Sequence, residues 1–247
     1  MKPTGNTILI TGGGSGIGRE FARRWHDRGN IVIVAGRTAA SLEETAAGRE
    51  NIHTLTFDAS EAGDITDLAR TAVERFPALN VLVNNAGIMR YEEIAASRDL
   101  SDAEATIATN LLGPIRLTDA LVDHLAARGD GAIINVTSGL AFVPMPRTAT
   151  YSATKAALHS YTVSLRARLA GRIEVIEIAP PAVRTELTPG QSTREGYMPL
   201  DQFIAETMAQ FEIGDTPPEV LTQNVKFLRN AEAEGRFDAA LAMTSRF

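Results

Sequence analysis

The sequence predicts a single α/β domain, in which a doubly wound parallel sheet of six to seven strands carries helices on both faces. Three observations lead to this prediction. Short β-branched apolar runs alternate with amphipathic segments over residues 1–180. The runs stay apolar on both sides of the strand alternation, as strands that are buried on both faces require. A glycine-rich turn connects the first apolar run to the first amphipathic segment.

The individual elements follow from this pattern in chain order. Strands are expected at residues 7–11, 31–36, 53–57, 81–85, 132–138 and 173–179. Helices are expected at residues 17–29, 39–47, 61–76, 101–127 and 148–170. The strand segments are rich in β-branched residues, which favour extended chains. Gly29 suits the end of the first helix, because glycine readily adopts the left-handed conformation found there.

The chain divides into a core, a loop region and a tail. Residues 1–180 form the expected nucleotide-binding core. The segment 187–213 begins with a polar stretch that holds two glycines and two prolines, which is typical of a mobile substrate lid. The tail 214–247 is expected to be helical, and the run FEI at 211–213 is the only candidate for a seventh strand.

Composition argues against several classes of function. The 247 residues are 44% hydrophobic and 22% charged, which fits a packed domain, and the net charge is -6. Without a basic cluster, nucleic acid is not an expected partner. Without cysteine, and with four histidines at no metal-ligand spacing, no disulfide and no metal site are expected. Without a secretory signal or a membrane-spanning run, a cytoplasmic protein is expected.

The turn TGGGSGIG at residues 11–18 is the first candidate binding element. Gly12, Gly16 and Gly18 are spaced so that the chain can turn tightly, approach a pyrophosphate and pack the helix against the strand. The helix that follows offers free N–H groups and the positive end of its dipole to phosphates. A dinucleotide site is therefore predicted here, and the alternative is a tight turn without a ligand.

The residue after the second strand indicates which dinucleotide binds. NAD sites usually carry an acidic residue here, which holds the ribose 2′-hydroxyl. This chain has Arg37 instead. A guanidinium can bind a 2′-phosphate through two hydrogen bonds, whereas a carboxylate would repel it. NADP(H) is therefore favoured over NAD(H), unless Arg37 is only a solvated surface side chain.

The stretch YSATK at residues 151–155 places Tyr151 and Lys155 on one face of a helix. Because a phenol has a pKa of about 10, it is a poor base at neutral pH. An ammonium group one turn away is expected to lower this pKa and so to make Tyr151 an efficient general acid or base. Alone, such a pair is more often a half-buried tyrosine beside an incidental lysine, so the other motifs have to support the catalytic interpretation.

The helix expected over residues 101–127 contains a proline near its middle. Pro114 has no N–H, so the carbonyl of Asn110 loses its partner in the helix, and the helix should kink there. A carbonyl freed in this way could hold a water that feeds protons to Lys155. The alternative is that Gly113 and Pro114 only relieve packing.

Several further motifs complete an ordered set. The set consists of TGGGSGIG (11–18), Asp58, NNAG (84–87), Asn110, Ser138, YSATK (151–155) and PPAVRT (180–185). In this combination the chain resembles the classical short-chain dehydrogenase/reductase (SDR) family over residues 5–187, and its wider spelling is similar to the DltE-type oxidoreductases. The resemblance implies a single-domain Rossmann fold and hydride transfer between a nicotinamide and a carbonyl or alcohol substrate.

The resemblance also implies roles for individual residues. Tyr151 matches the catalytic acid/base, Lys155 the residue that lowers its pKa and holds the nicotinamide ribose, and Ser138 the hydroxyl that binds the substrate oxygen. Asn110 matches the relay residue, and Asp58 the residue that hydrogen-bonds the adenine. The other implied cofactor contacts are Gly12, Ser15, Gly16, Ile17, Gly18, Asn84, Ala86, Gly87, Pro181, Val183 and Thr185.

Substrate choice is expected to lie in residues 88–98, 139–147 and 187–213. Within the second segment, the side chains of Phe142, Val143 and Met145 suggest an apolar wall beside the catalytic serine, or else plain packing. A homodimer is also expected. Its contact would involve residues on the two long helices that are either interface or inner core, namely Leu121, Leu125 and Leu165.

Two other functions are weighed against an SDR enzyme. A cofactor-binding sensor or scaffold that has lost its chemistry would not need the intact set of Asn110, Ser138, Tyr151 and Lys155. A sugar-nucleotide epimerase or dehydratase also uses YxxxK, but such enzymes usually carry a TGxxGxxG turn and a larger substrate domain, which this chain lacks.

Overall fold

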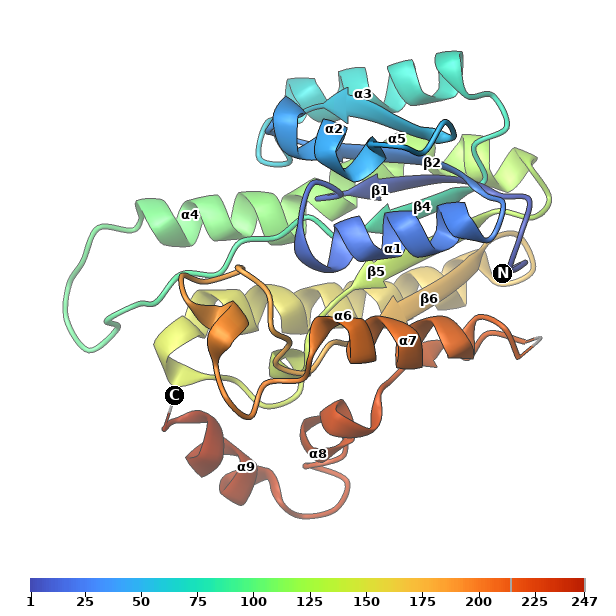
Figure 1. Cartoon of the computed structure of the whole chain (residues 1–247). Helices are drawn as coiled ribbons and strands as arrows, with labels where there is room; N and C mark the ends of the chain where they lie inside the picture. Colours follow the sequence, from blue (N-terminus) through green and yellow to red (C-terminus); the bar gives the residue numbers. More distant parts are fainter. Residues whose placement is uncertain (214, 247) are drawn as a thin grey trace.

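In the computed structural model, which describes residues 1–213 and 215–246, seven parallel strands form one sheet (Figure 1). The strand order is β3-β2-β1-β4-β5-β6-β7. The strands are β1 (Thr7–Thr11), β2 (Ile31–Gly36), β3 (Ile52–Thr56), β4 (Val81–Asn84), β5 (Ala132–Val136), β6 (Glu174–Ile178) and β7 (Glu219–Val220). The order reverses between β1 and β4, where a doubly wound sheet opens a crevice at the carboxyl ends of its strands. The predicted fold class is confirmed.

Helices cover both faces of this sheet (Figure 1). One face packs against α1 (Gly16–Asp27) and α7 (Leu200–Gln210), and the other against α3 (Ala62–Arg75), α5 (Gly113–Ala127) and α6 (Ala149–Leu169). The remaining helices are α2 (Ala39–Ala46), α4 (Ser101–Ile107), α8 (Lys226–Arg229) and α9 (Phe237–Thr244). None of the helices in the described part of the chain has the length and hydropathy needed to span a bilayer.

The helix expected over residues 101–127 is interrupted. A wide turn of π-helical geometry, Ala108–Leu112, separates α4 from α5, and Pro114 lies in the first turn of α5. The missing N–H of this proline explains why regular α-helix bonding cannot continue. The packing alternative also has support, because a Cβ on Gly113 would lie 2.6 Å from the carbonyl oxygen of Ala59. The other strands and helices predicted up to residue 170 agree with the structure within two residues.

The region after residue 187 differs from the prediction. Residues 200–210, expected within the lid, form α7. Phe211, expected in a strand, instead follows the last residue of α7 as its C-cap. Its side chain is buried, and its ring stands edge-on to that of Trp25 at 5.8 Å. The seventh strand is β7, which pairs in parallel with β6 but has only two residues and therefore leaves almost no pattern in the sequence. The tail thus holds a short strand and two short helices, and its residues 214 and 247 lie outside the described part.

Two of the leucines considered for a dimer contact are core residues. Leu121 and Leu125 of α5 have no exposed surface, and Leu165 packs against the same cluster. They face the sheet, because their side chains repeat with the period that points one side of a helix inward. Exposed apolar side chains on α4, α6 and the π-helical turn include Ile107, Leu112 and Val163.

Candidate active site

A cavity of about 430 Å³ lies along the carboxyl ends of the strands. It extends from Arg37 and Asp58 past the glycine-rich turn to Tyr151 and Lys155. The predicted site residues that line it are Gly12, Ser15, Gly16, Ile17, Gly18, Arg37, Asp58, Ala86, Gly87, Ser138, Tyr151, Lys155, Pro181, Val183 and Thr185. Segments that are far apart in the sequence therefore meet at one crevice, as the reversal of strand order requires.

The glycine-rich turn is shaped by close backbone contacts. A Cβ on Gly18 would lie 2.3 Å from the carbonyl oxygen of Gly12, and Gly12 itself has a positive φ of 68°. Only glycine fits both positions. Ser15 stands at the N-cap of α1 without a side-chain capping bond, so the first N–H groups of this helix remain available to an anion.

The charged end of the cavity holds Arg37 and Asp58. Burial raises the pKa of Asp58, but the N–H and hydroxyl of Ser60 and the positive charge of Arg37 outweigh this effect and hold the pKa below its usual value. Asp58 is thus an anion that accepts from Ser60 through Oδ1. Arg37 is exposed at the rim of the cavity, where a 2′-phosphate could approach it.

The other end of the cavity brings three buried polar side chains together. Ser138 follows β5, its Oγ accepts from the N–H of Leu140 at 3.1 Å, and its hydroxyl is close enough to Tyr151 of α6 to act on the pKa of the phenol. The Nζ atom of Lys155, one turn further along α6, donates to the carbonyl oxygen of Val136 at 2.8 Å and lies 5.6 Å from the centre of the Tyr151 ring. The phenol of Tyr151, the hydroxyl of Ser138 and the amine of Lys155 therefore line the same end of the cavity.

Burial controls the protonation of Tyr151 and Lys155. It raises the pKa of Tyr151 to about 12, although the hydrogen bond with Ser138 acts in the opposite direction. Burial also lowers the pKa of Lys155 to about 8. Without cofactor, loss of solvation therefore outweighs any attraction between Lys155 and the Tyr151 phenolate, and the lowered pKa expected beside a bound nicotinamide stays a prediction. Tyr151 is a protonated phenol, which suits a proton donor.

Asn110 lies beneath this group, in the π-helical turn. Its amide exchanges two hydrogen bonds of 2.8 Å with the backbone of Ile88, and its Nδ2 also donates to Thr154 Oγ1 at 3.3 Å. A Cβ on Gly87 would come within 3.3 Å of Asn110 Oδ1 and 3.6 Å of Lys155 Nζ. Asn110 thus fixes the backbone at Ile88, the residue after Gly87, at the edge of the cavity near Lys155.

Comparison with known proteins agrees with this geometry. A family model described as short chain dehydrogenase matches residues 6–196. The chain belongs to the short-chain dehydrogenase family. It is 39% identical over 235 residues to the uncharacterized oxidoreductase DltE of Bacillus subtilis (strain 168), covering 94% of this chain and 93% of that protein. The predicted similarity to the SDR family and its DltE-type members is confirmed.

Two solved structures extend the comparison. One, a short chain dehydrogenase from Burkholderia cenocepacia J2315 in complex with NADP, superposes with a TM-score of 0.82 at 25% identity and covers 98% of this chain and 99% of its own. The other is a 3-ketoacyl-(acyl-carrier-protein) reductase from Brucella melitensis complexed with NADH. It has a TM-score of 0.75 at 28% identity and covers 83% of this chain and 89% of its own.

One residue predicted to contact the cofactor does not line the cavity of this short-chain dehydrogenase. Asn84 does not reach the cavity, because its amide is buried and donates to Thr118 Oγ1 at 3.2 Å and to Asn135 Oδ1 at 2.9 Å. The next residue, Asn85, lines the cavity instead, and its Nδ2 donates to the carbonyl oxygen of Thr11 at 2.9 Å. Strand alternation distinguishes the two asparagines. Asn84 lies two residues after the buried Leu82, so both side chains point to the same face of the sheet, and the side chain of Asn85 is expected to point the other way.

The substrate segments of this short-chain dehydrogenase are only partly as expected. Ile88 and Arg90 line the cavity, as expected for residues 88–98. The apolar side chains after Ser138 form no wall of the cavity. Phe142 packs edge-on against His159 at 4.9 Å, and Val143 is buried against the C-terminal tail. For this segment the packing alternative is therefore correct.

The start of the lid segment lines the cavity through residues that were not singled out individually from the sequence. These are Leu187 and Gln191, together with the preceding Glu186. The Nε2 atom of the buried Gln191 donates to the carbonyl oxygen of Val183 at 2.9 Å and to Thr185 Oγ1 at 3.3 Å. Gln191 had no detectable signal, because a polar residue in a loop gives no periodicity that would indicate burial.

Proposed function

We propose that this protein is an NADP(H)-dependent oxidoreductase that transfers a hydride between the nicotinamide and a carbonyl or alcohol substrate. The observation that carries the proposal is the meeting of Ser138, Tyr151 and Lys155 at one end of a cavity whose other end holds Arg37. The relatives are consistent with a nicotinamide cofactor, since the two solved structures above contain NADP and NADH respectively. Arg37 favours the phosphorylated form.

The shape of the cavity fits a dinucleotide. The close backbone approach at Gly12 and Gly18 leaves no side chain between the turn and the cavity, and the uncapped start of α1 provides N–H donors for a pyrophosphate. Asp58 and Arg37 suit the adenosine end, and Val183 and Thr185 the nicotinamide end. Bound there, the nicotinamide would supply or accept the hydride.

The residues around Tyr151 supply the rest of the chemistry. The Ser138 hydroxyl donates to the substrate oxygen and stabilises the negative charge that develops on it. The phenol of Tyr151 then transfers its proton to this oxygen. The Lys155 ammonium holds the cofactor ribose and stabilises the phenolate that remains, because opposite charges attract strongly in a buried site. Asn110 keeps the backbone at Ile88, near Lys155, in place.

An oxidation screen tests the proposal directly. NADPH is mixed with the protein and with panels of aldehydes, ketones, quinones and keto-esters, and the loss of absorbance of NADPH is followed. Turnover with at least one carbonyl compound is expected, and it should disappear in the Tyr151→Phe variant. Tight NADPH binding without turnover on any panel would instead favour the sensor or scaffold alternative.

Arg37→Ala is expected to raise the Kd for NADPH by about 10-fold or more, because a charge-assisted pair with the 2′-phosphate is lost. The Kd for NADH should change by less than about twofold, since NADH lacks this phosphate. Fluorescence titration of both cofactors measures the effect, and NADH serves as the internal control. Equal losses for both cofactors would show that Arg37 acts structurally, and a wild type that prefers NADH would contradict the NADP(H) proposal.

We propose that the lid consists of residues 187–199, because the residues from 200 to 210 form α7. The C-terminal end of the lid is anchored by two backbone hydrogen bonds of 2.9 Å: the N–H of Met198 donates to the carbonyl oxygen of Ala182, and the N–H of Arg184 donates to that of Met198. In hydrogen exchange, the amides of 192–197 should exchange fast without ligand and slow down with NADPH, while the Met198 amide stays protected throughout. Protection of 192–197 without cofactor, or none with NADPH and a substrate analogue, would contradict a lid.

We also propose a homodimer, with a corrected contact. The apolar side chains of Ile107, Leu112 and Val163 are each more than one third exposed on neighbouring helices, and burying them offers the driving force that the inward-facing leucines cannot. Light scattering at micromolar concentration should give the dimer mass. Val163→Glu should shift the protein to monomer, and a monomeric wild type would contradict the proposal.

A further inference from the structure

A buried polar row crosses the sheet one layer below the catalytic residues. Asn84, Asn135, Glu177 and Glu219 lie side by side in register on β4, β5, β6 and β7. Glu177 has no exposed surface, although it carries a carboxylate in a position where a parallel sheet normally has an apolar residue. Burying a charge is costly unless it is well paired, so its partners are informative.

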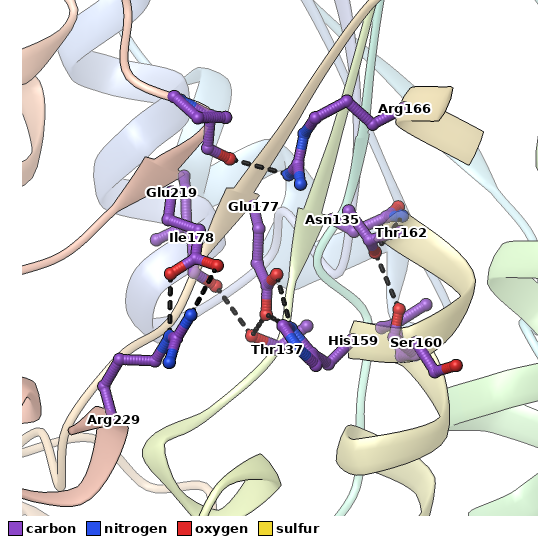
Figure 2. Close-up of polar contacts among 12 residues, drawn as sticks. Asn135, Thr137, His159, Ser160, Thr162, Arg166, Glu177, Ile178, Glu219 and Arg229 are labelled. Carbon is purple, nitrogen blue, oxygen red and sulfur yellow. Dashed lines mark hydrogen bonds and ion pairs between the residues drawn. The ribbon is translucent and has the colours of Figure 1, made fainter. Parts of the chain in front are cut away.

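Glu177 is bound by two neighbours (Figure 2). Its Oε1 accepts from the hydroxyl of Thr137 at 2.6 Å. Its Oε2 lies 2.8 Å from Nδ1 of His159, a residue of α6. The carboxylate thus connects the strand end that leads into the active site with the helix that carries Tyr151 and Lys155.

Glu219, at the outer end of this row, is paired with an arginine. Arg229 donates to both oxygens of Glu219, at 2.8 and 3.0 Å. The nearest ligand atoms of His159, Glu177 and Glu219 lie within 4.8 Å of one another, a spacing that a metal ion could use. However, the Arg229 guanidinium occupies Glu219, and Thr137 and His159 occupy Glu177. The pairing therefore explains the cluster without a cation.

Thr137 connects Glu177 to the serine of the active site. Thr137 directly precedes Ser138, and its N–H donates to the carbonyl oxygen of Ile178 at 2.8 Å. Ser138 continues the extended chain, with φ of −172° and ψ of 156°. Because successive side chains of an extended chain point to opposite sides, holding Thr137 on one face of the sheet fixes the backbone from which the Ser138 side chain leaves on the other face, where its Oγ also accepts from the N–H of Leu140 at 3.1 Å.

We propose that Glu177, acting through Thr137, is a positioning residue that aims the Ser138 hydroxyl at Tyr151 and at the substrate oxygen. The inference rests on the proposed function, because it assigns Ser138 to the substrate. At 2.6 Å the bond from the Thr137 hydroxyl to Glu177 Oε1 is short, so it holds the Thr137 rotamer firmly. A small displacement of a group that binds the reacting oxygen is enough to slow a reaction severely.

Variants at Thr137 separate positioning from folding. Thr137→Val removes the hydroxyl at nearly constant volume and should lower kcat by about 10-fold or more, while the Kd for NADPH stays within about threefold. Thr137→Ser keeps the hydroxyl and should restore kcat to within about threefold of wild type. Glu177→Gln keeps an acceptor but loses the charge, and an intermediate loss is expected. The matched control is Glu219→Gln, which alters the neighbouring carboxylate without touching Thr137 and should retain wild-type kcat.

The outcomes are distinct. Wild-type kcat in Thr137→Val, failure of Thr137→Ser to restore it, or an equal loss in Glu219→Gln would overturn the proposal. Crystal structures of wild type and Thr137→Val provide a readout that needs no turnover, because the Ser138 hydroxyl should turn away from Tyr151 only in the variant. If wild type reduces no carbonyl compound, the proposed function fails, but an unchanged Ser138 rotamer in this comparison would still overturn the positioning role by itself.

Discussion

Tyr151→Phe is expected to lower kcat by at least about 10²-fold, the usual contribution of a general acid. The phenol of Tyr151 is buried and its pKa is raised to about 12, so it is fully protonated at neutral pH and has a proton to give. Phenylalanine keeps the ring and its packing but offers no proton. The Kd for NADPH should therefore change little, and the loss should appear in single-turnover reduction with a good carbonyl substrate.

A second tyrosine on the same helix provides the control. Tyr161 of α6 is half-buried and does not line the cavity. Tyr161→Phe should leave kcat within about twofold of wild type. If Tyr151→Phe turned over at a near-normal rate, or if both variants lost the same activity, the assignment of Tyr151 as the acid would be wrong.

The fold was predictable because its signals are local and repeated. Each buried strand is a run of β-branched residues, and the turn at Gly12 and Gly18 could be interpreted from residue type alone, since any Cβ at Gly18 would collide with the backbone. What escaped prediction depends on long-range packing. The strand β7 has two residues, and its partner β6 lies about forty residues earlier in the chain.

The site was predictable in its residues but less so in its environment. Tyr151, Lys155 and Ser138 meet as the motifs suggested, yet the pKa of Tyr151 is set by burial and not by the lysine one turn away. Burial is a property of the whole fold, so helix spacing alone could not reveal it. Glu177 is a similar case. A single charged residue in a strand suggests an exposed position, and only the structure shows its partners Thr137 and His159.

Lys155→Met is expected to lower kcat by about 10²-fold or more, because it removes the charge that stabilises the Tyr151 phenolate and the donor that holds the cofactor ribose. Unlike Tyr151→Phe, it should also weaken NADPH binding. Turnover and cofactor titration on the two variants distinguish the roles. A lysine variant with normal cofactor affinity would contradict the proposed contact with the ribose.

The same variant should change how stability depends on pH. The pKa of Lys155 is about 8 in the folded protein, against 10.5 for the solvated side chain of the unfolded chain. Between pH 8 and 10.5 the unfolded chain therefore binds more protons, so the free energy of unfolding of wild type rises with pH relative to Lys155→Met. Below pH 8 lysine is protonated in both states, and the two proteins should show the same pH slope.

The contribution of Lys155 to the pH dependence of the unfolding free energy is large enough to measure. The difference between the two pKa values corresponds to at most ~3 kcal/mol by pH 10.5, because each pKa step is worth about 1.4 kcal/mol. Tyr151 has the opposite sign, since its raised pKa makes stability fall with pH, but only above its unfolded value of 10.0. Urea unfolding of both proteins at pH 7.5, 8.5 and 9.5, without cofactor, isolates the lysine. Unfolding free energies that stay parallel from pH 8 to pH 9.5 would show that Lys155 enters the buried site fully charged.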